Sequence, residues 1–102
     1  MSPAQRHMEL VARAGCVIGN QGLDSCAGRV ECHHIAVGSG KRSDYATAGL
    51  CTKHHDEAKA GTGFHGMGTR RFCQIFRVPG ECEWGMMAWV AEDISKIKEL
   101  SK

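Results

Sequence analysis

Two pairs of adjacent histidines stand in the middle of this chain, and they constrain its fold more than any other feature. The pairs are His33-His34 and His54-His55, and Cys51 precedes the second pair in a Cys-x-x-His step. Imidazole is the commonest metal ligand and the only side chain whose ordinary pKa lies near neutrality. Each pair can place one histidine on a metal and leave its neighbour for another task. The Cys-x-x-His spacing is typical of half a structural zinc site.

The upstream cysteines complete the ligand set. Cys16 and Cys26 supply two thiolates, and together with Cys51 and His54 they give Cys₃His, a closed tetrahedral set typical of structural zinc. The metal would join a turn-rich zinc loop over residues 16–28 to the strands and helix that follow, and it would contribute folding energy. The alternative interpretation is that these cysteines are free buried thiols.

Three further cysteines are left over by this assignment. Cys32 lies beside His33 and could replace one upstream cysteine as a ligand, whereas Cys73 and Cys82 are interpreted as core packing or free thiols. We expect ligands and free thiols rather than a disulfide framework, because the N-terminal residues show no apolar run of a secretory signal. We therefore expect a cytoplasmic protein.

Length and composition indicate one small domain over residues 1–102. The chain is 42% hydrophobic and 24% charged, which is ordinary for a soluble globular protein. Its net charge of +2 permits nucleic-acid binding without demanding it. No stretch approaches the roughly 20 apolar residues that span a bilayer, so we expect no membrane association.

Periodicity and turn residues predict an α+β domain. Ser2 and Pro3 begin a helix that Gly15 ends, and Thr52 and Thr69 can cap short helices. The expected elements after the zinc loop are strands over 29–37 and 45–50 around a flexible basic loop, short helices over 53–60 and 70–76 separated by a glycine-rich loop over 61–68, and an amphipathic helix over 83–100.

The central segment resembles the HNH endonucleases, which have a ββα-metal fold. The resemblance rests on residues 31–35 (ECHHI), the basic loop and residues 50–55 (LCTKHH). It is nearer to small phage-type members, similar to the Ref-like, RecA-dependent nucleases and related prophage nucleases, through residues 63–69 (GFHGMGT) and 83–85 (EWG). It implies a ββα-metal core over residues 29–61 and a C-terminal helical part over 69–100.

The resemblance also implies roles for single residues. His34 would be the general base, and His33 and His55 would bind a catalytic Mg²⁺ or Mn²⁺. His65 could replace the family's further histidine ligand, and Thr47 lies near the place of the missing middle Asn. Strand periodicity sends His33 and His34 to opposite faces, so both reach one site only at a bulge or a strand end.

These roles predict a metal-dependent DNA endonuclease or nickase, encoded by a phage or prophage and acting in recombination or DNA processing in the host cytoplasm. DNA is the expected partner, and the Ref-like resemblance adds a recombinase. Two alternatives stay open: a zinc-stabilised module that binds DNA or protein without catalysis, which the missing Asn favours, and a metallohydrolase of another substrate. The expected phosphate contacts are Lys41, Arg42, Arg70 and Arg71.

Overall fold

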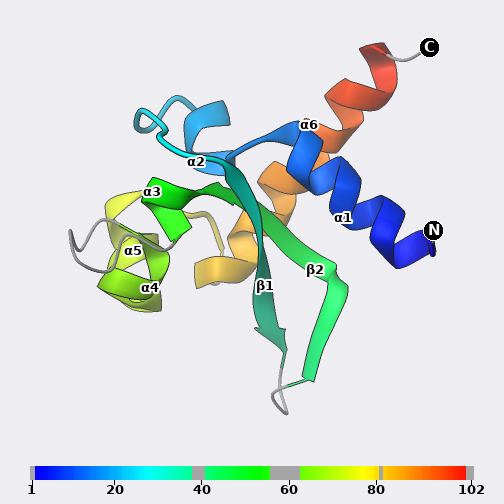
Figure 1. Cartoon of the computed structure of the whole chain (residues 1–102). Helices are drawn as coiled ribbons and strands as arrows, with labels where there is room; N and C mark the ends of the chain where they lie inside the picture. Colours follow the sequence, from blue (N-terminus) through cyan, green and yellow to red (C-terminus); the bar gives the residue numbers. More distant parts are fainter. Residues whose placement is uncertain (1, 38–40, 56–62, 81, 101–102) are drawn as a thin grey trace.

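A β-hairpin forms the centre of the fold in the computed structural model, which describes residues 2–37, 41–55, 63–80 and 82–100 (Figure 1). Strand β1 (Val30–Val37) pairs antiparallel with β2 (Lys41–Cys51). The register sets His33 opposite Ala48 and His34 opposite Thr47, and an irregularity follows between His34 and Ala36. The ladder is therefore interrupted directly after the first histidine pair.

Helices surround the hairpin, and the combination confirms the predicted α+β class. In Figure 1, α1 lies on one side of the hairpin and α3, α4 and α5 lie on the other, while α2 lies above it and α6 runs behind it toward the side of α1. Within the described ranges, no helix is both long and apolar enough to cross a membrane. The helices are α1 (Pro3–Ala14), α2 (Val17–Asn20), α3 (Thr52–His55), α4 (Phe64–Met67), α5 (Thr69–Ile75), the 3₁₀ helix η1 (Cys82–Gly85) and α6 (Met86–Leu100).

The start and end of α1 follow the predicted signals. The Ser2 hydroxyl accepts a hydrogen bond from the Gln5 backbone N–H, and the Gln5 side chain accepts one from the Ser2 N–H, which makes a capping box. Gly15 ends the helix at a φ of +92°, a conformation that a side chain would strain. One face of α1 then packs on the hairpin through Val11.

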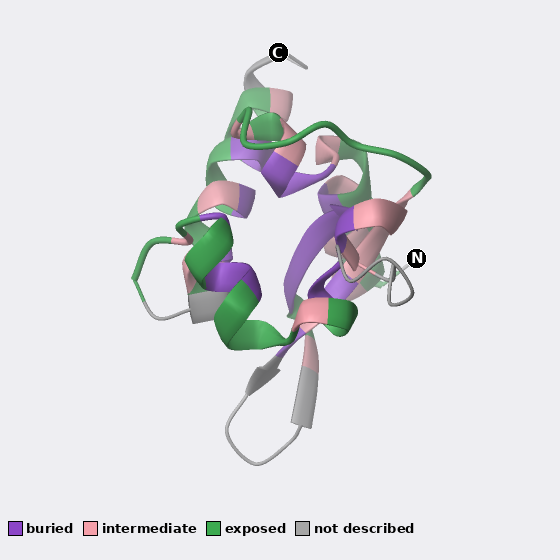
Figure 2. Cartoon of the chain, turned by 90° about the vertical axis from the view of Figure 1, so that its left-hand side faces the viewer, coloured by how far each residue is buried: buried purple, intermediate pink, exposed green. Residues whose placement is uncertain are grey.

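The core fills the space between the hairpin and the helices. Figure 2 shows buried residues along the strands and on the helix faces turned toward them, whereas the outer helix faces are exposed. Burying these apolar side chains supplies the main driving force for folding. The core includes Val11, Ile18, Leu50, Phe64, Phe72, Phe76, Met86 and Val90.

Several predicted boundaries were wrong, and pairing or close packing explains two of them. β2 begins at Lys41 rather than at residue 45, because Lys41 and Arg42 pair with the end of β1 despite their loop-like composition. The final helix begins at Met86, because residues 82–85 form a 3₁₀ turn in which any Cβ on Gly85 would collide with the Pro79 carbonyl.

Two predicted loops contain short helices, α2 within residues 16–28 and α4 within residues 61–68. Thr69 is the first residue of α5, and Gly68 rather than Thr69 is its N-cap. Thr52 likewise opens α3 instead of capping it, and its hydroxyl donates to the Arg29 carbonyl. The predicted continuation of α3 over residues 56–60 and the loop at residues 38–40 lie outside the described residues.

Gly49 provides a test of this packing. Its position on β2 faces the end of α1 so closely that a Cβ would collide with the Gly15 carbonyl oxygen and lie 3.1 Å from that of Val11. We expect Gly49→Ala to lower the free energy of unfolding by about 3 kcal/mol, since neither backbone can yield locally. Gly22→Ala is the control, because its Cβ meets nothing within 4 Å, and only the strain of its φ of +69° remains. If urea unfolding showed the same decrease in the free energy of unfolding for both variants, this would contradict the close packing at Gly49.

Candidate metal centres

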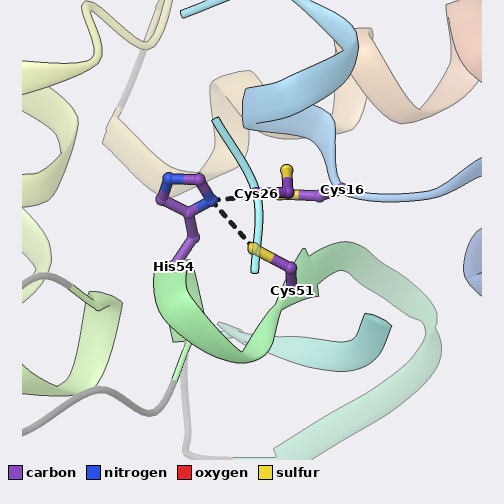
Figure 3. Close-up of side chains that lie close together, drawn as sticks. All are labelled: Cys16, Cys26, Cys51 and His54. Atoms are coloured by element: carbon purple, nitrogen blue, oxygen red, sulfur yellow. Dashed lines mark hydrogen bonds between the residues drawn. The ribbon is translucent and has the colours of Figure 1, made fainter. Parts of the chain in front are cut away.

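The four side chains predicted to bind zinc converge in the structure (Figure 3). Their ligand atoms all lie within 4.8 Å of one another. His54 Nδ1 lies 3.0 Å from Cys51 Sγ and 3.4 Å from Cys16 Sγ. Ligand atoms around a tetrahedral zinc with Zn–S bonds of about 2.3 Å are separated by roughly 3.5–3.8 Å. The cluster, Cys16, Cys26, Cys51 and His54, can therefore hold a metal such as zinc.

Different elements deliver the four ligands. Cys16 is the N-cap residue of α2, Cys51 ends β2, and His54 lies in α3, where its side chain is fully buried. Cys26 comes from the exposed segment between α2 and β1. Its sulfur approaches α2 so closely that a Cβ on Gly19 would collide with it, so only glycine fits there.

The electrostatics of the three thiols fit a bound cation. Cys26 is exposed as a residue, but its sulfur lies against α2, and this desolvation, followed by the proximity of Cys16 and then Cys51, raises the pKa of Cys26 to about 12. Burial also opposes ionisation of Cys51, but hydrogen bonds from the backbone N–H groups of Ala27 and His54 lower its pKa overall. Three thiolates at this spacing repel one another, and a divalent ion would remove the conflict.

Asp24 contacts the ring nitrogen of His54 that does not face the sulfur atoms. Its Oδ2 lies 3.0 Å from His54 Nε2 and 3.3 Å from Lys53 Nζ, and the hydrogen bond from His54 is the main reason that its pKa falls to about 2. The carboxylate holds the proton on Nε2, so Nδ1 faces the sulfur atoms with its lone pair. Such carboxylate–histidine pairs orient metal ligands in many proteins. Asp24 was not among the predicted site residues, and its one signal in the sequence is its position two residues before Cys26.

A second cluster joins the three histidines predicted to bind a catalytic ion. The ligand atoms of His33, His55 and His65 lie within 4.8 Å of one another, and the Nε2 atoms of His55 and His65 are 3.1 Å apart. The three come from β1, α3 and α4. His33 is buried, with its ring centroid 4.3 Å from that of Phe64, whereas His65 is exposed. The cluster thus opens to solvent on one side.

Glu31 contacts a histidine of the second cluster, as Asp24 does in the first. Its Oε1 lies 3.2 Å from His55 Nδ1, and its Oε2 lies 3.5 Å from Arg29 Nη2. With the Nδ1 proton donated to Glu31, the lone pair of His55 Nε2 faces His65. Three imidazoles around an ion leave coordination positions for water or a substrate, which is the arrangement of catalytic rather than structural sites.

Within the described residues, His34 is not one of the histidines whose ligand atoms converge. Its Nε2 lies 2.9 Å from Asp44 Oδ1, and its side chain is 23% exposed. Thr47 is fully buried opposite His34, and its hydroxyl donates to the Asp44 carbonyl oxygen at 3.3 Å. The hydroxyl of Thr47 is therefore bound to the backbone of Asp44, and it lies too deep to contact a substrate. Asp44 is a further residue that sequence analysis missed.

The other candidates lie apart from both clusters. Cys32 donates its thiol to the Met8 carbonyl at 3.4 Å, which disfavours the alternative in which it replaces a zinc ligand. Cys73 is buried on α5, as core packing requires. Arg70 and Arg71 are exposed on α5, which follows the helix that carries His65. The side chains of Lys41, Arg42 and Cys82 lie outside the described part of the structure.

Comparison with protein-family models, curated proteins and solved structures found no significant match for this chain.

Cys51 tests the first cluster. We expect purified protein to hold one tightly bound zinc and Cys51→Ser to lose it and unfold, because the zinc supplies folding energy that a serine hydroxyl cannot retain. Cys32→Ser is the matched control, since its hydroxyl can still donate to Met8 and its sulfur is no ligand. Elemental analysis and circular dichroism measure both effects. A folded, zinc-loaded Cys51→Ser protein would show that this cluster is not the zinc site.

Asp24 tests the orientation of His54. Asp24→Asn should weaken zinc binding by about 10- to 100-fold, because the amide no longer fixes the proton on Nε2 of His54. Competition with a chromogenic chelator measures the affinity. Asp44→Asn is the control, since it removes a similar histidine contact outside the cluster. Equal affinities for Asp24→Asn and the wild type would contradict the supporting role.

Proposed function

We propose that this chain is a metal-dependent DNA endonuclease or nickase of the HNH type. The observation that carries the proposal is the convergence of His33, His55 and His65, of which His33 directly precedes His34 in the chain. The resemblance to the HNH family assigned all four histidines from the sequence. The ligand atoms of His33, His55 and His65 lie within 4.8 Å of one another, which supports these three as one ligand set.

The order of elements supports a ββα-metal core. Two antiparallel strands are followed directly by α3, and the ligands come from the first strand, from α3 and from the segment beyond it. The Cys₃His cluster lies at the junction of β2 and α3, and its ligand His54 stands next to His55. A structural zinc there would fix the helix that carries a catalytic ligand.

The chemistry of the proposed reaction fits the residues. Hydrolysis of a phosphodiester needs a water molecule deprotonated near neutral pH, which a neutral imidazole such as His34 can do. A divalent ion held by the three histidines would supply positive charge to the phosphate and the leaving 3′ oxygen. The resemblance implies Mg²⁺ or Mn²⁺, whereas a set of imidazoles also suits Zn²⁺ or Ni²⁺. The assay below therefore compares these ions.

DNA would be held mainly by its phosphates. Arg70 and Arg71 are exposed on α5, next to α4 and its ligand His65. Such contacts position the backbone without reading its sequence. Lys41 and Arg42 at the hairpin end are proposed as further contacts. We further propose that the protein is encoded by a phage or prophage and located in the host cytoplasm. There it would act in recombination together with a recombinase.

A non-catalytic, zinc-stabilised module that binds DNA or protein is the second candidate. The burial of Thr47 favours it, because the residue near the place of the family's Asn cannot reach a substrate. This module would keep the zinc and the phosphate contacts and would show no cleavage.

A plasmid-nicking assay separates the two. We expect wild-type protein to nick supercoiled DNA with added Mg²⁺, Mn²⁺, Ni²⁺ or Zn²⁺ and not with EDTA, and His34→Ala to lose at least about 100-fold in rate because the general base is gone. Zinc content and fold should remain. Glu9→Ala is the control, since Glu9 is exposed on α1, which contributes no residue to either cluster.

Two outcomes would contradict parts of the proposal. Unchanged nicking by His34→Ala would remove the base assignment. DNA binding by the wild type without cleavage in any of the four ions would establish the binding module instead.

A further inference from the structure

We propose that Asp44 is a positioning residue that fixes the orientation and the proton location of His34. The inference rests on the proposed function, in which His34 is the general base. Asp44 Oδ1 lies 2.9 Å from His34 Nε2, and the two side chains are 51% and 23% exposed. The pair thus borders solvent, where a substrate can reach it.

The irregularity in the hairpin creates this contact. From Val30 to His34 the register is regular, and its continuation would set Asp44 opposite Val37, three residues beyond His34. Three residues of strand span about 10 Å, too far for a hydrogen bond. Instead Ala36 pairs with Arg42, so residues 43–46 of β2 oppose only Ile35 of β1. The displaced segment brings Asp44 alongside His34.

Two side-chain hydrogen bonds hold the displaced segment. The Thr47 hydroxyl donates to the Asp44 carbonyl oxygen at 3.3 Å, and the Ser43 hydroxyl accepts from the Tyr45 backbone N–H at 3.2 Å. Bulges recur beside active sites, where they redirect side chains. The buried Thr47 would therefore act indirectly, because its hydrogen bond holds the backbone of Asp44, the residue that positions His34.

The pairing determines which nitrogen of His34 acts as the base. A carboxylate only accepts hydrogen bonds, so the proton lies on Nε2 and the lone pair lies on Nδ1. In the proposed hydrolysis, Nδ1 takes a proton from water as the water oxygen bonds to phosphorus. The bond from phosphorus to the 3′ oxygen then breaks, and that oxygen takes a proton from solvent. The Asp44 carboxylate, within hydrogen-bond distance of Nε2, would stabilise the imidazolium.

The kinetic test uses the full-length, zinc-loaded protein. Asp44→Asn keeps the size of the side chain but can donate to Nε2 and so favour the wrong tautomer. We expect kcat for plasmid nicking to fall about 100-fold or more with KM nearly unchanged, and Asp44→Glu to recover part of the rate. Glu9→Gln controls for the loss of one negative charge, because Glu9 is exposed on α1.

A spectroscopic readout separates positioning from a merely structural role. In ¹⁵N–¹H spectra of the imidazoles at pH 8, wild-type His34 should be protonated at Nε2, and Asp44→Asn should shift the proton toward Nδ1 while zinc content and thermal unfolding stay the same. A kcat within twofold of the wild type, or an unchanged His34 tautomer in Asp44→Asn, would overturn the proposal.

The same spectra distinguish this proposal from the nuclease itself. A wild-type protein that cleaves no DNA would overturn the nuclease and the catalytic consequence of the pairing, whereas the Nε2–H signal of His34 would still support the pairing with Asp44. A nuclease whose His34 is protonated at Nδ1 would overturn the pairing alone.

Discussion

The cluster of Cys16, Cys26, Cys51 and His54 is the interaction on which the rest of the structure depends. It joins the start of α2, the segment before β1, the end of β2 and α3 at one point. A domain of this size buries a modest apolar core, so a metal at this junction would add to the packing that holds these segments. Because His55 follows His54 directly, any ion that fixes α3 in the first cluster also aims His55 at His33 in the second. The positions of the two clusters are therefore coupled through α3.

Three of the site histidines each contact a carboxylate, and these contacts are the second feature that orders the site. Asp24 faces His54, Glu31 faces His55, and Asp44 faces His34. Each contact fixes one ring nitrogen as the proton carrier and leaves the other for a metal or a substrate. Histidines of the two pairs therefore differ in their carboxylate partners, although the side chains themselves are identical.

The α+β class and the residues of both clusters were predictable from the sequence, because spacing and residue type carry that information locally. Asp24 and Asp44 were not predictable in this way, since their partners depend on how distant segments meet. Asp44 was assigned to a loop, and only the three-residue displacement in the pairing of β1 and β2 brings it to His34. Strand alternation likewise sends His33 and His34 to opposite faces, and only the folded hairpin shows that His33 joins the histidine cluster while His34 turns to Asp44.

Zinc-edge X-ray absorption of the protein loaded with one equivalent of zinc tests the central claim most directly. The account predicts a first coordination shell of three sulfur atoms at about 2.3 Å and one nitrogen at about 2.0 Å. A shell of nitrogen and oxygen atoms without sulfur would place the tightest metal site elsewhere and would contradict the account.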